Sequence, residues 1–240
     1  MVVYNGHRRC RSVRTLKITH IILAVNVLIA IVMFFAGNLS AFRSQTYLFI
    51  RFGAQYGPLV SDGEWYRLIT AIFVHGGLLH LLFNSYALFY FGTIVESVYG
   101  PEKFIFSYLA TGVVGNIATH LFYYRAISVG ASGSIFGLVG ILFSLGFRRD
   151  TPFFMKQFTG YALLPMILFN IIYGFIPGSG INNAAHVGGF ALGMLLGYLL
   201  SPRPAYYSRK SWSLLWKIIA IVCGVSIASS FILLVSFSAR

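Results

Sequence analysis

Two side chains that could do chemistry lie at the edges of long apolar stretches. Ser132 lies in the run Gly-Ala-Ser-Gly-Ser-Ile-Phe-Gly, and His186 follows Asn-Asn-Ala-Ala. A neutral imidazole within hydrogen-bond reach of a serine can take its proton and return it to a leaving amine. Each residue alone also has a structural interpretation, because a serine can cap a helix and a histidine can bond a neighbouring helix. Ser134 is a second candidate nucleophile.

A third and a fourth polar side chain, His80 and Asn84, interrupt another apolar stretch. Their spacing of four residues places both on one face of a helix. Both can donate hydrogen bonds toward a common point. The alternative is that they bond neighbouring helices, which contributes about 0.6 kcal/mol per bond on average in membranes. The spacing alone favours this alternative.

Membrane-spanning helices must position these side chains. Hydrophobic residues make up 58% of the 240 residues and charged residues 10%, whereas a soluble domain has about 25% charged residues. This composition excludes a soluble globular protein and predicts an all-α polytopic membrane protein. A spanning helix needs about 20 mostly apolar residues. Seven stretches approach this length: 18–36, 74–96, 103–124, 132–147, 158–176, 184–200 and 212–236.

The basic residues predict how the chain is oriented. Eighteen Lys and Arg against five Asp and Glu give a formal net charge of +13. With a cytoplasmic N-terminus, 13 basic residues fall on the cytoplasmic side and five outside, in agreement with the positive-inside rule. The charge therefore requires no nucleic-acid partner. We expect a multi-pass protein of the cell membrane with an external C-terminus.

Glycines in the sixth stretch predict which helix packs against it. Gly189, Gly193 and Gly197 recur every four residues, which produces a face of small residues. Such a face allows another helix to approach closely. We expect the glycine-bearing fourth stretch to pack there and to bring Ser132 within reach of His186.

The loop between the first and second stretches is unusually long. It covers about 37–73 and is rich in aromatic residues. Long loops inside compact domains tend to be functional. Because Trp and Tyr side chains favour the membrane interface, we expect this segment to lie there. The alternative is a poorly ordered external loop.

A metal site would be another use for several histidines. His75, His80, His120 and His186 are available, but no HExxH motif, acidic span or cysteine cluster accompanies them. The two cysteines do not suggest a disulfide framework. We therefore expect neither a metal nor a cofactor. No aspartate is evident to orient His186, which favours a Ser–His dyad over a triad.

In combination, these motifs resemble those of the rhomboid family of intramembrane serine proteases. The resemblance covers nearly the whole chain. It rests on Trp65-Tyr66-Arg67 in the long loop, HxxxN in the second stretch, GxSGxxxG at the fourth, and AHxxG at the sixth. Each motif is weak alone, whereas the ordered set is specific.

The resemblance implies a role for each matching residue. Ser132 would be the nucleophile, and His186 the general base and acid. His80, Asn84 and the backbone N–H of Ser132 would line the oxyanion hole, and Phe136 would lie against the ring of His186. The supporting motif residues are Gly130, Gly133, Gly137, Gly189, Trp65 and Arg67, although Tyr66 separates the last two where many members have them adjacent. Glu96 resembles a position that braces the inner end of the second helix.

The resemblance also implies an architecture and a class of substrate. Residues 1–17 would form a basic cytoplasmic N-terminus, 18–200 a six-helix protease core, and 201–240 a cytoplasmic linker and a seventh helix. The substrates would be transmembrane proteins, cut in or near helices at a site that opens to the external face. Two other functions remain: a non-catalytic binding protein or chaperone for membrane helices, and a small transporter.

Overall fold

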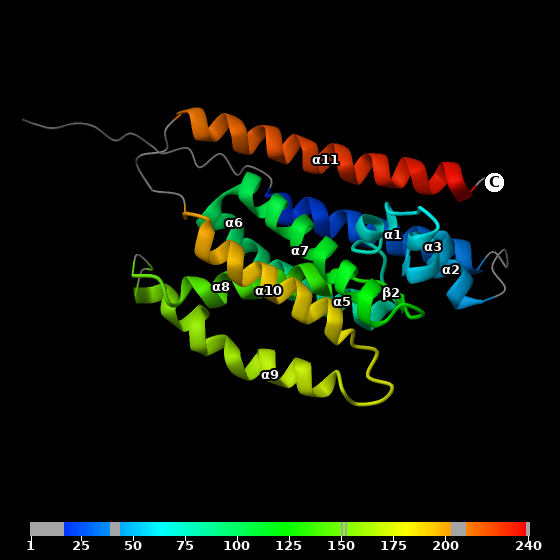
Figure 1. Ribbon diagram of the computed structural model, residues 1–240, viewed down its shortest axis with the longest axis horizontal. Coiled ribbons are helices and arrows are strands. Elements are labelled where there is room, and N and C mark those ends of the chain that lie inside the picture. The colour runs from blue at the N-terminus through cyan, green and yellow to red at the C-terminus, as the bar shows by residue number, and fades with distance from the viewer. Residues whose placement is uncertain (1–16, 39–43, 150, 152, 203–209, 239–240) are drawn as a thin grey trace, which may run out of the picture.

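The computed structural model describes residues 17–38, 44–149, 151, 153–202 and 210–238. The chain is mostly helical (Figure 1). The predicted cytoplasmic N-terminus lies outside the described residues except for Lys17, as does most of the segment that joins the sixth and seventh stretches.

Four helical stretches among the described residues are long and apolar enough to cross a membrane. The first, third and last are single helices. The second is helical from Leu78 to Tyr99 and contains one π-helical turn, η1. Their bounds are α1 (Ile18–Asn38), α5 (Leu78–Ala87), η1 (Leu88–Gly92), α6 (Thr93–Tyr99), α7 (Pro101–Phe122) and α11 (Lys210–Ser238).

The remaining predicted spans are shorter helices. They are α8 (Ser132–Leu145), α9 (Leu164–Tyr173) and α10 (Asn183–Leu199). The prediction that a helix over 158–176 begins at residue 158 is wrong. Two 3-10 helices occupy the region before α9: η2 (Phe153–Phe158) and η3 (Gly160–Leu163). Gly160 has a positive φ of 61°, which a continuous α-helix does not allow. Pro165, in the first turn of α9, suits a new helix start.

The start of the second span also differs from the prediction. Residues 74–77 are not helical, because Gly77 has a φ of 141° and α5 begins only after it. His75 therefore lies in the connection before the helix. This leaves His80 in the first turn of α5, where the backbone before the helix can reach its ring.

The long loop is folded over residues 44–77. It contains three short helices and one strand: α2 (Gln45–Arg51), β1 (Gln55–Tyr56), α3 (Gly57–Ser61) and α4 (Arg67–Thr70). Strand β1 pairs antiparallel with β2 (Ile127–Ser128), just before α8. The described part of the loop is thus an ordered scaffold that reaches the segment carrying Ser132, and the alternative of a poorly ordered loop is wrong for these residues.

Helix α8 lies in the core and packs against α7 and α10. A Cβ atom on Gly189 would overlap the carbonyl oxygen of Gly133, and one on Gly193 would overlap that of Gly137. Gly197 faces the carbonyl oxygen of Ile141 in the same way. The predicted close packing of the fourth and sixth stretches is confirmed. In Figure 1, α9 and α11 lie on opposite sides of this core.

Candidate active site

Ser132 is the first residue of α8. The first N–H groups of a helix have no partner within it and carry a partial positive charge. Gly130 precedes the helix with a φ of 121°, a conformation that favours glycine. Its N–H donates to the carbonyl oxygen of Ala71 at 2.9 Å, which fixes the approach to α8. The half-buried Ser132 therefore stands at the start of a helix whose entry is held from the side of the long loop.

His186 lies in the first turn of α10, close to the N-cap residue Asn182. The Asn182 side chain accepts a hydrogen bond from the N–H of Ala185 at 3.0 Å. Its amide also donates to Thr119 Oγ1 at 2.8 Å and to Ser128 Oγ at 2.9 Å. Asn182 thereby joins the start of α10 to α7 and to the strand that leads toward Ser132. Sequence reasoning assigned it no role, although an asparagine just before a helix indicates an N-cap.

The ring of Phe136 stacks on the ring of His186. Their centroids are 4.0 Å apart and their planes differ by 10°. His186 is 4% exposed, and within the described part of the chain its Nδ1 has no hydrogen-bond partner. The imidazole is thus held by an aromatic face and helix packing, with no carboxylate bonded to Nδ1 in this part of the protein.

His80 and Asn84 lie beside Gly130. A Cβ atom on Gly130 would be 2.8 Å from both Nε2 and Cε1 of His80, and 3.8 Å from Nδ2 of Asn84. The N–H of Gly76 donates to Nδ1 of His80 at 3.2 Å. In a neutral ring, the proton is then on Nε2, on the side of Gly130. Asn84 Nδ2 donates to the carbonyl oxygen of His80 at 3.0 Å, so one of its two hydrogens remains available.

Ser134, the other candidate nucleophile, is packed against α7. It is 1% exposed, and a Cβ atom on Gly112 would overlap its hydroxyl oxygen. Its hydroxyl has no hydrogen-bond partner among the described residues. Because its surroundings exclude a substrate, Ser132 is the better placed of the two serines.

The other histidines lie in separate environments. The ring of His75 meets the ring of His80 edge-on at 5.4 Å, and its Nδ1 is 3.2 Å from the carbonyl oxygen of Phe73. His120 instead packs between Trp65 at 6.5 Å and Tyr124 at 5.3 Å. No group of three His, Cys, Asp or Glu side chains in the described ranges is arranged to hold a metal ion.

Arg67 and Trp65 have different environments in the long loop. The buried Arg67 contacts Glu64 Oε2 through Nε and Nη2, each at 2.7 Å. Its Nη1 donates to the carbonyl oxygens of Ile50 at 2.7 Å and Ala54 at 3.2 Å. Trp65 is 60% exposed. Arg67 therefore joins separate parts of the loop, and Trp65 presents its ring at the surface.

Tyr66, between these two residues, also binds Glu64. Its hydroxyl donates to Glu64 Oε2 at 2.5 Å. Burial, followed by this hydrogen bond, raises the pKa of Tyr66 above its usual range. Tyr66 therefore stays protonated and keeps donating to Glu64 over the physiological pH range.

Glu96 binds the start of α1. Its carboxylate accepts hydrogen bonds from the N–H groups of Ile18 at 2.8 Å and Thr19 at 3.0 Å, and from the Thr19 hydroxyl at 2.5 Å. A carboxylate at a helix N-terminus pairs with unsatisfied N–H groups and complements the helix dipole. Glu96 is thus a structural residue at the far end of the second span from Asn84.

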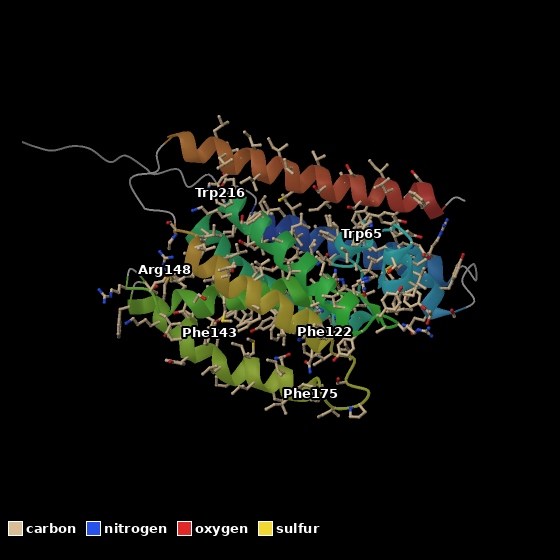
Figure 2. The ribbon with its side chains drawn as sticks, in the orientation of Figure 1. Trp65, Phe122, Phe143, Arg148, Phe175 and Trp216 are labelled. Carbon is tan, nitrogen blue, oxygen red and sulfur yellow. The ribbon has the colours of Figure 1, made fainter. Side chains whose placement is uncertain are left out.

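The candidate site residues are far apart in the sequence but lie at one end of the bundle. Figure 2 shows Trp65, Phe122 and Phe175 toward one end, here called the Trp65 end, and Arg148 and Trp216 toward the other, the Arg148 end. The first residues of α5, α8 and α10 supply His80, Ser132 and His186. Helix α7 finishes at the same end, where Thr119 meets Asn182.

Comparison with known proteins gives a consistent family assignment. The rhomboid domain model matches residues 62–203. Rhomboid protease GluP of Bacillus subtilis is 34% identical over 86% of this chain and 39% of its own length. RHOMBOID-like protein 4 of Arabidopsis thaliana is 38% identical over 64% of the chain and 39% of its own length. The chain thus spans about two fifths of each of these relatives. Putative rhomboid protease YdcA of B. subtilis is 39% identical over 60% of the chain and 71% of its own length.

Proposed function

The chain belongs to the rhomboid family, and from this premise we propose that it is an intramembrane serine endopeptidase. The observation that carries the proposal is the contact between α8 and α10. Gly189 lies against the carbonyl oxygen of Gly133. Gly133 follows Ser132 directly, and Gly189 lies three residues after His186. This contact supports Ser132 and His186 as a nucleophile and base on facing helix ends.

In the proposed reaction, Ser132 Oγ attacks the carbonyl carbon of a peptide bond. Its proton passes to Nε2 of His186, since Nδ1 of that ring is buried. His186 then gives the proton to the departing amine, which leaves an acyl-enzyme on Ser132. Water adds to the ester carbonyl, again with His186 as base, and Ser132 regains its proton when the acid product leaves.

The negative charge on the carbonyl oxygen requires donors that are already in place. Nε2 of His80, the remaining hydrogen on Asn84 Nδ2 and the N–H of Ser132 are the proposed donors. The proximity of His80 and Asn84 to Gly130, two residues before Ser132, supports this role. Removing one donor of this kind typically costs about 10²–10³ in rate.

A Ser–His dyad fits the surroundings of His186. The stacked ring of Phe136 would orient the imidazole as a bonded carboxylate does in a triad. Because Phe136 has no hydroxyl, it would act through packing alone. Gly130, Gly133, Gly137 and Gly189 would support the dyad by letting backbone approach side chain or backbone closely.

We also propose how the multi-pass protein sits in the membrane. Residues 18–200 would form a six-helix core in which α8, α9 with η3, and α10 cross alongside the longer helices, and 201–240 would supply the linker and an additional helix, α11. The N-terminus would be cytoplasmic and the site would open outside. The basic residues support this orientation: Lys17 binds Ser97 at the end of α6, Lys103 binds the Ser201 carbonyl, and Arg148 binds the last carbonyls of α10.

The proposed substrates are membrane proteins with a transmembrane helix. A helix keeps its carbonyl groups in internal hydrogen bonds, so the cut segment must unwind before Ser132 can attack it. Small or helix-breaking residues would favour that unwinding.

The test is cleavage of a labelled single-pass protein by the purified chain in liposomes. Ser132→Ala and His186→Ala should abolish cleavage, whereas Ser134→Ala is the matched control and should retain it, because its hydroxyl faces α7. Cleavage that survives Ser132→Ala would overturn the mechanism. Substrate binding without cleavage in the unaltered chain would favour a helix-binding chaperone, and solute transport that survives Ser132→Ala would favour a transporter.

A further inference from the structure

The last turns of α11 pack on the segment that contains α4. The rings of Phe231 and Phe73 meet at 5.8 Å, and those of Phe237 and Tyr66 at 5.9 Å. Leu234 is buried, and its Cδ2 would lie 2.9 Å from a Cβ atom on Gly53. We call residues 67–76 the α4 segment. Figure 1 shows this end of α11, in red, beside the helices of the long loop.

The α4 segment touches both halves of the candidate site. The carbonyl oxygen of Ala71 accepts from the N–H of Gly130 at 2.9 Å, two residues before Ser132. The N–H of Gly76 donates to Nδ1 of His80 at 3.2 Å. One short segment thus contacts the entry to α8 and the ring that would bind the oxyanion.

Hydrogen bonds to other parts of the protein also hold the α4 segment. Asn116 of α7 donates to the carbonyl oxygen of Leu68 at 2.8 Å. Thr70 donates through Oγ1 to the carbonyl oxygen of Gly53 at 2.7 Å. Helix α11 also contacts α4 and α7. The α4 segment is therefore held by hydrogen bonds to the protein interior and by side-chain packing against α11.

In a membrane, apolar contacts between helices fix the positions of side chains more than they stabilise the fold. Lipid tails are as apolar as the side chains of Phe and Leu, so they can replace the apolar contacts of α11 at little cost in free energy. A fluid tail cannot hold Phe73 in one place as the ring of Phe231 does. Small shifts in the geometry of reacting groups, in contrast, have large effects on rate.

We propose that α11 is a positioning helix for the candidate site, and that Phe231 and Leu234 are its positioning residues. Phe231 holds the α4 segment directly through Phe73, and Leu234 holds it through Gly53, whose carbonyl binds Thr70. Together they keep Gly76 against the ring of His80 and Ala71 against Gly130. The inference rests on the proposed function for its effect on turnover. Its structural part, the restraint of the α4 segment, is measured separately.

The two ends of α11 contact different parts of the protein. We therefore expect substitutions in its last turns to leave the helix in place. At the other end, Trp216 meets the ring of Phe106 at 5.7 Å, and Lys103 Nζ lies 5.5 Å from the Trp216 ring. Ile232 and Val235, next to the positioning residues, are 65% and 69% exposed. Because these side chains are exposed, they provide matched controls in the same turns of the helix.

The experiment compares Phe231→Ala and Leu234→Ala with Ile232→Ala and Val235→Ala in the full chain in lipid nanodiscs. Hydrogen exchange of peptides covering 67–80 and 127–132 should be faster in the first pair and unchanged in the controls. Cleavage of the single-pass substrate should show kcat about tenfold lower with KM little changed, since the shift affects reacting groups rather than binding. Leu234→Met, which conserves volume, should restore both readouts.

Two results would overturn the inference. One is equal hydrogen exchange in positioning and control variants; the other is a lower thermal midpoint in the positioning variants with unchanged kcat. An unaltered chain that cleaves nothing would instead contradict the proposed function, and the exchange comparison would still decide whether α11 restrains the α4 segment.

Discussion

At the scale of single residues, hydrogen bonds determine which donor atoms of the proposed oxyanion hole are available. The N–H of Gly76 occupies Nδ1 of His80 and so leaves the Nε2 proton of a neutral ring for a substrate. Asn84 uses one amide hydrogen on the His80 carbonyl and keeps the other. The Asn84 amide thus bonds the backbone carbonyl of His80, which keeps the two proposed donors on the same face of α5.

Asn84→Ala should lower kcat by about 10²–10³ with little change in KM, because the lost bond strengthens as charge develops in the transition state. Steady-state cleavage of the single-pass substrate measures both constants. Ser85→Ala, the adjacent position, is the control and should behave like the unaltered chain. A higher KM at constant kcat would contradict a role in the oxyanion hole.

Residue-level prediction from the sequence was effective where the signal was local. The spacing of His80 and Asn84 placed them on one helix face, and the glycine run marked the start of α8 at Ser132. The bonds from Asn182 to Ser128 and Thr119 join residues 54 and 63 positions apart. No periodicity or spacing predicts such a bond, because it depends on how the completed helices meet.

At the scale of elements, α8 and α10 approach so closely that backbone meets backbone. The four-residue glycine repeat in α10 predicted this contact, since small residues at that spacing line one face. The α9 region was less predictable. Its apolar composition continued through 158–163, while Gly160 and Pro165 placed the start of the α-helix at Leu164.

Gly189→Ala should destabilise the fold by about 1–3 kcal/mol, because the new methyl group meets a backbone carbonyl that cannot rotate away. Thermal unfolding in detergent micelles measures the effect. The control is Gly224→Ala on α11, where nothing lies within 4 Å of the added atom. Equal midpoints for the two variants would show that the helices have room to separate.

At the scale of the whole molecule, charge and structure agree on two distinct ends. The Arg148 end gathers basic side chains that bond helix termini, including Lys103 and Arg148. The Trp65 end carries the folded long loop and the candidate site. The orientation inferred from the positions of Lys and Arg stays a prediction. The folded loop was not predicted, because its shape depends on distant contacts such as the pairing of β1 with β2.

Thiol labelling of intact cells tests the proposed orientation. Arg125→Cys and Arg149→Cys would each be placed in a chain that also carries Cys10→Ser and Cys223→Ala. Both arginines are exposed, one after α7 and the other after α8. A membrane-impermeant maleimide should label the Arg125→Cys chain and spare the Arg149→Cys chain until the cells are opened. The reverse pattern would place the Trp65 end inside the cell.

The contact of α11 with the α4 segment has a consequence for biogenesis. Ser132 and His186 both precede α11 in the chain, so a nascent protein inserted only as far as α10 already contains the proposed dyad. Under the proposed role of α11, that intermediate has a loosely held His80 and turns over substrate slowly. The proposed protease would then gain full activity only after α11 has docked, which would limit cleavage of neighbouring membrane proteins at the site of insertion.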